Sequence, residues 1–153
     1  MMQNDESTKI IIGLTGGSGS GKSTIGKSCE DYDCLYIDAD KIGQEVILRG
    51  QPGYDEVLAV FGNEILGANE EIDRRKLGGV VFSNPEKLKI LNSISHRHIT
   101  EKIKEMVSIT DKKFIIIDGA VIIGSIVEGM CDYIISVISS KEIRLGRILE
   151  RDD

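Results

Sequence analysis

The sequence predicts an α/β fold in which a parallel β-sheet is flanked by helices. Apolar runs of strand length alternate along the chain with segments whose apolar residues recur at helical spacing. The strand candidates are residues 9–15, 35–37, 114–118 and 133–138. The last two are almost wholly apolar, which is typical of strands that are covered on both faces, as in a parallel sheet.

A glycine-rich loop after the first strand candidate is the second observation behind this fold. Residues 16–23 read GGSGSGKS and match the phosphate-binding pattern G-x-x-x-x-G-K-[ST]. Residues 22–30 can form the helix that must follow the loop. A flexible Gly/Ser linker would explain the glycines, but it needs neither the apolar strand before them nor the Gly-Lys-Ser-Thr run behind them. The sequence therefore predicts a three-layer P-loop fold.

The loop residues have distinct roles in binding a nucleoside triphosphate. Successive backbone N–H groups bind phosphate oxygens, and the helix adds the positive end of its dipole. Lys22 can reach the β- and γ-phosphates, and the Ser23 hydroxyl can bind Mg²⁺. A nucleoside triphosphate and Mg²⁺ are the expected ligands of this loop. The residues expected to bind the nucleotide are Gly16, Gly17, Ser18, Gly19, Ser20, Gly21, Lys22, Ser23 and Thr24.

Composition limits the partners of the chain. Its 153 residues suit one domain, and its net charge of −6 argues against a general binder of nucleic acid or anionic membranes. No apolar run is long enough to span a bilayer, and residues 1–8 do not resemble a signal peptide. Three cysteines without an export signal fit a reducing cytosol. We therefore expect a cytoplasmic protein with a small-molecule substrate and leave its oligomeric state open.

The stretch between the second and third strand candidates is too long for one crossover helix. Residues 41–48, 53–61, 73–81 and 85–107 all have helical patterns. Ser83 and Glu86 form a possible capping box at the start of the last of these. We therefore expect a helical insertion over residues 39–111, close to the phosphate site.

Three carboxylates follow strand candidates, where ligands bind in open α/β sheets. Asp38 and Asp40 end the second strand. Asp40 could guide the proton of an acceptor hydroxyl, or it could cap a helix that starts at Lys41. The two side chains diverge if that helix already begins at Ala39. Asp118 could orient Mg²⁺, or it could be a turn residue in Asp-Gly.

Four segments together resemble the dephospho-CoA kinase family. The P-loop segment is shared with many proteins, whereas the IDAD and DRxxL…VF patterns at these spacings are much more specific. The four segments are residues 13–24 (GLTGGSGSGKST), 37–43 (IDADKIG), 72–82 (IDRRKLGGVVF) and 147–152 (RILERD). The resemblance implies phosphoryl transfer from ATP to the ribose 3′-hydroxyl of dephospho-CoA, giving coenzyme A and ADP.

The resemblance also implies roles for individual residues. Asp40 would be the catalytic base with Asp38 nearby, and Lys22 would neutralise charge on the transferred group. Residues 1–38 and 112–153 would form the nucleotide-binding core and the start of a lid. Residues 39–111 would form the helical insertion that binds the acceptor, within a single kinase domain spanning residues 1–153.

Further roles concern phosphate and acceptor contacts. Arg74 would grip acceptor phosphates, although it could instead pair with Asp73 or Glu71 at a helix start. His96 matches a family histidine that contacts the acceptor. Arg151, with Arg147 one turn before it, would stabilise charge from the lid. Arginines on an exposed surface helix have the same four-residue spacing.

The sequence also departs from the family pattern. Arg97 follows His96 where a proline is usual, and residues 118–123 replace the usual Pro-Leu-Leu-Phe-Glu run. The chain ends at Asp153, early in the expected lid, so we expect a fragment. Another small-molecule or nucleotide P-loop kinase and a truncated, non-catalytic remnant are alternatives. A GTP-binding switch is a further one, since residues 40–43 fit D-x-x-G, but no Asn-Lys-x-Asp segment follows.

Overall fold

The computed structural model describes residues 8–119 and 122–152 and divides into two compact units. Residues 1–40 and 106–153 form the sheet unit, and residues 41–105 form the helical unit. The sheet unit contains strands β1 (Ile10–Thr15), β2 (Cys34–Asp38), β3 (Phe114–Asp118) and β4 (Tyr133–Ser136). All paired strands are parallel, in the order β2-β3-β1-β4, which confirms the predicted α/β fold class.

The register of the sheet brings strand ends together at its carboxyl edge. Ile37 is opposite Ile117, and Asp38 is opposite Asp118. Leu14 of β1 is also opposite Asp118. Ile37 and Ile117 are both buried, at no more than 1% exposure. This apolar centre holds the polar strand ends in fixed positions.

The expectation that residues 133–138 are covered on both faces is wrong for the described part of the chain. All four residues of β4 are exposed, whereas the last four residues of β3 are buried. β3 is central in the sheet, whereas β4 pairs only with β1 at one edge. The strand at the other edge, β2, contacts α1 and η1. The strand also ends at Ser136, two residues earlier than expected.

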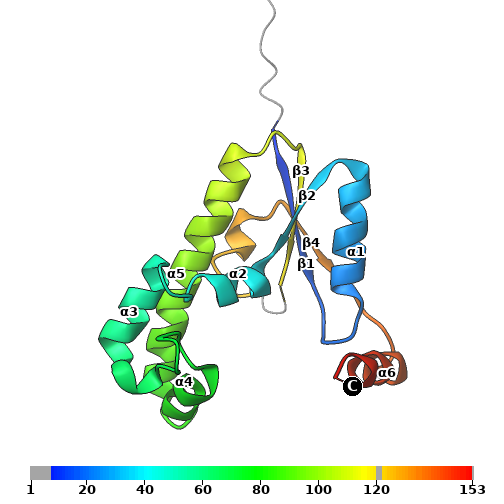
Figure 1. Cartoon of the computed structure of the whole chain (residues 1–153). Coiled ribbons are helices and arrows are strands. Elements are labelled where there is room, and N and C mark those ends of the chain that lie inside the picture. Colours follow the sequence, from blue (N-terminus) through cyan, green and yellow to red (C-terminus); the bar gives the residue numbers. More distant parts are fainter. Residues whose placement is uncertain (1–7, 120–121, 153) are drawn as a thin grey trace, which may run out of the picture. The chain divides into compact units, whose positions relative to one another are not determined.

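Helices of the sheet unit connect the strands to the loop. The phosphate-binding loop leads into α1 (Lys22–Ser28), which contacts β1, β2 and β3 (Figure 1). A short 3₁₀ helix, η1 (Cys29–Tyr32), continues from α1, so the α-helix is shorter than the predicted 22–30. A second 3₁₀ turn, η3 (Glu128–Met130), precedes β4, and α6 (Lys141–Asp152) follows it.

The four helices predicted between the second and third strands are confirmed. They are α2 (Ala39–Glu45), α3 (Pro52–Phe61), α4 (Arg74–Val81) and α5 (Pro85–Ile109), with a 3₁₀ turn η2 (Asn63–Ile65) after α3. The apolar faces of α3, α4 and α5 meet with Ile65 of η2 in one buried cluster within the helical unit. Its members are Val57, Phe61, Ile65, Leu77, Val81 and Ile94. No helix in the described ranges is both long enough and apolar enough to cross a membrane.

Two side chains cap helices in the helical unit. The Asp73 carboxylate accepts hydrogen bonds from the backbone N–H groups of Arg75 and Lys76 at the start of α4. The predicted capping box of Ser83 with Glu86 is wrong, because Asn84 caps α5 by accepting from the next two free N–H groups. Ser83 lies one residue too early, and its hydroxyl donates to the Gly79 carbonyl instead.

Candidate functional site

The loop between β1 and α1 has a backbone that requires glycine. Gly16 has φ +150° and Gly21 has φ +102°, both in the region that residues with side chains rarely adopt. A Cβ atom on Gly16 would lie 2.3 Å from the Val137 carbonyl oxygen, so a side chain is also excluded by space. The glycines therefore allow the close backbone path by which such loops surround a phosphate. The Ser20 N–H donates within the loop, to the Gly17 carbonyl at 3.1 Å.

A cavity of about 490 Å³ lies over this loop within the sheet unit. Its walls bring Lys22, Asp40 and Arg147 together around one space. The full lining is Ser18, Gly19, Ser20, Gly21, Lys22, Ser23, Thr24, Asp40, Arg147 and Ile148. Of the residues expected to bind the nucleotide, only Gly16 and Gly17 lie outside this lining, at the start of the loop.

The two aspartates after β2 take different positions. Asp38 is the last residue of β2, and α2 begins at Ala39, so Asp40 is the second residue of that helix. The side chains therefore diverge, and only Asp40 lines the cavity. A helix that begins at Ala39 also excludes the alternative in which Asp40 caps a helix starting at Lys41.

Asp118 is buried at 3% exposure, and its two carboxylate oxygens differ. Its Oδ2 accepts hydrogen bonds from the Ser23 hydroxyl at 2.9 Å and the Tyr36 hydroxyl at 2.8 Å. Its Oδ1 is buried and has no hydrogen-bond partner among the described residues. A simple turn residue would be solvated, so these contacts favour a ligand-binding role over a turn.

The Ser23 and Asp118 pair fits a Mg²⁺ site. Asp118 Oδ1, which has no hydrogen-bond partner among the described residues, can accept a hydrogen bond from a water of a hydrated cation. The Ser23 hydroxyl donates to the other oxygen of the same carboxylate. In the described part of the chain, no group of three or more His, Cys, Asp or Glu residues is placed to hold a metal ion. Mg²⁺ needs no such cage, since it commonly keeps several waters and binds one or two protein groups plus substrate phosphates.

Sequence reasoning missed Tyr36. Burial raises the pKa of its hydroxyl, and the hydrogen bond to Asp118 raises the pKa further, so the group is a protonated donor at neutral pH. The only signal in the sequence was a tyrosine two residues before Asp38 on the same face of an otherwise apolar strand. Its partner Asp118 is 82 residues away in the chain, so no local pattern could identify the contact.

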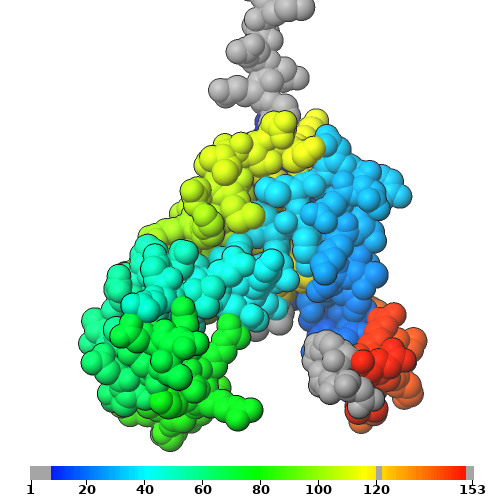
Figure 2. Space-filling model, in the orientation of Figure 1, coloured from blue at the N-terminus to red at the C-terminus, as the bar shows by residue number. Residues whose placement is uncertain are grey.

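Two arginines of α6 donate hydrogen bonds to backbone carbonyls of the phosphate loop. In the space-filling view, red atoms of the C-terminal segment lie beside blue atoms of the N-terminal segment (Figure 2). The Arg144 Nε donates to the Ser18 carbonyl at 2.9 Å. The Arg147 Nη1 donates to the carbonyls of Gly19 and Ser20 at 3.2 and 3.1 Å. Arg144 was not predicted, although it precedes Arg147 by three residues and so shares its helix face. Arg151 belongs to the last turn of α6, but its side chain lies outside the described part.

The predicted acceptor contacts in the helical unit lie on exposed helix positions. Arg74 is the first residue of α4 and is exposed, while the neighbouring Asp73 carboxylate is occupied with backbone N–H groups. Glu71, its other suggested partner, accepts from the backbone N–H of Arg49. His96 is exposed on α5. Both predicted side chains are therefore accessible to a ligand.

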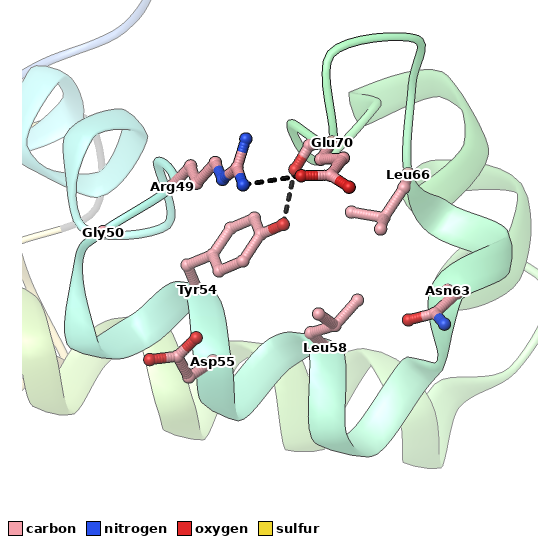
Figure 3. A pocket seen from close by; sticks show the side chains of 8 residues that line it. All are labelled: Arg49, Gly50, Tyr54, Asp55, Leu58, Asn63, Leu66 and Glu70. Atoms are coloured by element: carbon pink, nitrogen blue, oxygen red, sulfur yellow. Dashed lines mark hydrogen bonds and ion pairs between the residues drawn. The ribbon is translucent and has the colours of Figure 1, made fainter.

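The helical unit also has a cavity of its own, of about 550 Å³ (Figure 3). It is lined by Arg49, Gly50, Tyr54, Asp55, Leu58, Asn63, Leu66 and Glu70. The Arg49 guanidinium lies 2.6 Å from the Glu70 carboxylate, and the Tyr54 hydroxyl donates to the Glu70 carbonyl. The one cation of this cavity is thus neutralised, so its charge does not favour an anion. None of the predicted site residues lines it.

Comparison with known proteins gives consistent matches. The family model for dephospho-CoA kinase matches residues 10–153. A dephospho-CoA kinase of Fusobacterium nucleatum is 42% identical over 143 residues, which cover 94% of this chain and 74% of that relative. One from Carboxydothermus hydrogenoformans is 39% identical over 146 residues, covering 93% and 70%.

Solved structures agree in fold. A crystal structure of a Thermus thermophilus protein superposes with a TM-score of 0.82 at 27% identity, covering 94% of this chain and 73% of that one. A Campylobacter jejuni dephospho-CoA kinase has a TM-score of 0.60 at 22% identity, with 95% and 96% covered, and supports the fold alone. The sequence match over nearly the whole chain and the glycine loop with its cavity lead to one conclusion: the chain belongs to the dephospho-CoA kinase family.

Proposed function

We propose that this protein transfers the γ-phosphoryl group of ATP to the ribose 3′-hydroxyl of dephospho-CoA, producing coenzyme A and ADP. The observation that carries the proposal is the match of residues 10–153 to the dephospho-CoA kinase family. The cavity that joins the phosphate loop to Lys22, Asp40 and Arg147 supports it. Such a transfer needs little covalent chemistry from the protein and depends on positioning and charge stabilisation.

The donor side of the reaction belongs to the phosphate loop. Backbone N–H groups of residues 16–24 hold the donor phosphates, and Lys22 neutralises charge that develops on the transferred group. Ser23 and Asp118 would hold Mg²⁺, and the ion would offset the negative charge of the donor phosphates. Arg147, which lines the cavity, adds positive charge beside the phosphates, and the family pattern assigns the same role to Arg151.

The acceptor side belongs to Asp40 and to the helical unit. Asp40 orients the 3′-hydroxyl and takes its proton during transfer, a role that needs a carboxylate within hydrogen-bond reach of the oxygen. We assign Asp38, the last residue of β2, to the acceptor side as well. Residues of the helical unit bind the acceptor, with Arg74 at a phosphate group and His96 in contact with the acceptor. We place this activity in the cytoplasm, without nucleic-acid or membrane partners.

A direct assay with the protein tests the proposal. With ATP, Mg²⁺ and dephospho-CoA, we expect ADP and coenzyme A in equal amounts, measured by chromatography with mass detection. Adenosine and nucleoside monophosphates serve as competing acceptors. Turnover of a monophosphate with none of dephospho-CoA would contradict the assignment, and nucleotide binding without any transfer would favour a non-catalytic remnant.

The role of Asp40 is tested by a substitution that keeps its size. Asp40→Asn is expected to lower kcat on the order of 10²-fold, since a general base contributes about 10²- to 10⁴-fold. Binding of ATP, measured by calorimetry, should change little. A variant that keeps turnover but loses nucleotide binding would show that Asp40 is not the base.

A further inference from the structure

Tyr36 has a role at the site that neither the sequence pattern nor the family match assigns. We propose that Tyr36 is a positioning residue that holds the Asp118 carboxylate in one orientation for Mg²⁺, and that Gly26 is glycine to make room for it. The proposal rests on the proposed function for the identity of the reaction. Its geometry comes from three elements of the sheet unit: β2, β3 and α1.

The strand register brings the tyrosine to Asp118. Tyr36 is opposite Ile116 on the neighbouring strand, and Asp118 is two residues further along, on the same face. Diagonal neighbours of this kind are within reach of an aromatic side chain. The Tyr36 hydroxyl donates to Asp118 Oδ2 at 2.8 Å. The contact therefore follows from the pairing of β2 with β3.

Both hydrogen bonds to this carboxylate reach the same oxygen. Ser23 and Tyr36 donate to Oδ2, and Oδ1 remains buried without a partner among the described residues. Two donors on one oxygen fix the plane of the carboxylate and keep the other oxygen available. Groups that orient a metal ligand in this way commonly change metal affinity about 10- to 100-fold when they are removed.

Gly26 explains how the tyrosine ring fits. Gly26 lies three residues after Ser23, so both face the sheet from the same side of α1. A Cβ atom on Gly26 would lie 2.3 Å from Cε2 and 2.8 Å from Cδ2 of the Tyr36 ring. Glycine inside a helix is less favourable than alanine by about 1 kcal/mol. The close approach of the ring gives a reason for glycine at this position.

The Tyr36→Phe variant tests the role of the hydroxyl, since it keeps the ring and removes only the donor. Mn²⁺ replaces Mg²⁺ as a paramagnetic probe, and its binding to the complex of the protein with ADP is measured by electron paramagnetic resonance. We expect Mn²⁺ to bind about tenfold more weakly in Tyr36→Phe. The affinity for ADP in the presence of a chelator and the midpoint of thermal unfolding should stay near those of the parent. Tyr32→Phe is the matched control, because Tyr32 is 80% exposed in the same unit.

Kinetics give a second readout that a merely structural role would not change. The Mg²⁺ concentration for half-maximal turnover of ATP and dephospho-CoA should rise about tenfold in Tyr36→Phe, while kcat at saturating Mg²⁺ stays within about twofold. Parent-like Mn²⁺ affinity in Tyr36→Phe would overturn the proposal. So would an equal loss of ADP affinity with and without metal, since that indicates general damage to the site.

A Gly26→Ala variant tests the space requirement independently. Its methyl group should displace the tyrosine ring and weaken Mn²⁺ binding as Tyr36→Phe does, with a lower unfolding midpoint. The double variant Gly26→Ala/Tyr36→Phe should show no further loss of Mn²⁺ affinity, and additive losses would contradict the shared mechanism. A parent protein that binds Mn²⁺ with ADP but does not phosphorylate dephospho-CoA would overturn the proposed function alone.

Discussion

The sheet unit buries polar side chains beside its phosphate loop, whereas the helical unit buries an apolar cluster. In the sheet unit, Ser20 is 5% and Asp118 is 3% exposed, and Ser20 Oγ and Asp118 Oδ1 lack hydrogen-bond partners among the described residues. In the helical unit, the buried Thr100 hydroxyl donates to the His96 carbonyl at 2.7 Å. Its core is formed by Val57 and Phe61 with their apolar neighbours.

This difference separates residues that contribute to ligand binding from residues that contribute to the stability of the fold. A buried polar atom without a hydrogen-bond partner is unfavourable by about 1–3 kcal/mol. Such atoms are therefore expected where a bound ligand supplies the missing hydrogen bond. An apolar cluster has no such requirement and stabilises the unit by burial alone. Substitutions in the sheet-unit site should therefore change activity more than stability, and substitutions in the helical core should do the reverse.

The largest expected effect is the loss of turnover in Lys22→Ala. Lys22 lines the cavity over the phosphate loop, and a cation that stabilises the transferred phosphoryl group contributes on the order of 10³- to 10⁵-fold. This corresponds to roughly 4–7 kcal/mol of barrier height. We expect ADP formation to fall by that factor while the thermal unfolding midpoint changes little. Lys27→Ala, at an exposed position of α1, is the control, and a fully active Lys22→Ala would remove the phosphate-loop mechanism.

The next largest effect lies in the helical core. Phe61 is 4% exposed, and Phe61→Ala should lower the free energy of unfolding by about 3–5 kcal/mol, because it leaves a cavity in the apolar cluster. Urea denaturation followed by circular dichroism measures this change. Phe82 is 81% exposed in the same unit, so Phe82→Ala should stay within about 0.5 kcal/mol of the parent. Equal effects of the two variants would contradict the assigned core.

Asp118→Asn tests whether a buried group of the sheet unit contributes more to ligand binding than to the stability of the fold. We expect the Mg²⁺ concentration for half-maximal turnover to rise roughly 10- to 100-fold. The free energy of unfolding should change by less than about 1 kcal/mol, because the amide keeps the size of the side chain and removes a buried charge. Asp111→Asn, an exposed position of the same unit, is the control. Lost stability with unchanged Mg²⁺ dependence would assign Asp118 to the fold instead.

The sequence predicts the local features of both units well. Apolar runs and helical periodicity identified the strands and the four helices of residues 39–111, and the glycine pattern located the phosphate loop. The position of Asp40 just after the carboxyl end of β2 was sufficient to predict that it would lie near that loop, and it lines the cavity. All these features depend on neighbours within a few residues or on the known direction of parallel strands.

The features that were missed depend on distant neighbours. Tyr36 reaches Asp118 across 82 positions, and Arg144 reaches Ser18 across 126 positions. The β3 and β4 segments are similarly apolar, but of these two strands β3 has a paired strand on each side and β4 does not. Strand order cannot be predicted from periodicity. At the start of α5, Ser83 and Asn84 are both residue types that cap helices. Because the helix begins at Pro85, Asn84 is the residue in the capping position.

The smallest expected effect concerns Asp73 and depends on pH. Hydrogen bonds from the backbone N–H groups of Lys76 and Arg75 lower the pKa of its carboxyl below the ordinary value of 3.8. A carboxyl whose pKa is lowered by folding stabilises the folded state above its ordinary pKa, and this contribution is lost as the pH falls through the folded-state pKa. Asp73 should therefore contribute fully at pH 7 and progressively less below about pH 4.

Two substitutions separate the cap of Asp73 from its charge. Asparagine caps helices about as well as aspartate, so Asp73→Asn should resemble the parent at pH 7 but lose less stability between pH 5 and pH 3. Asp73→Ala removes the cap and should lower the urea midpoint at pH 7, by much less than Phe61→Ala does. Urea denaturation at several pH values measures both. An Asp73→Asn variant whose acid dependence equals that of the parent would show that the charge of Asp73 is not linked to folding.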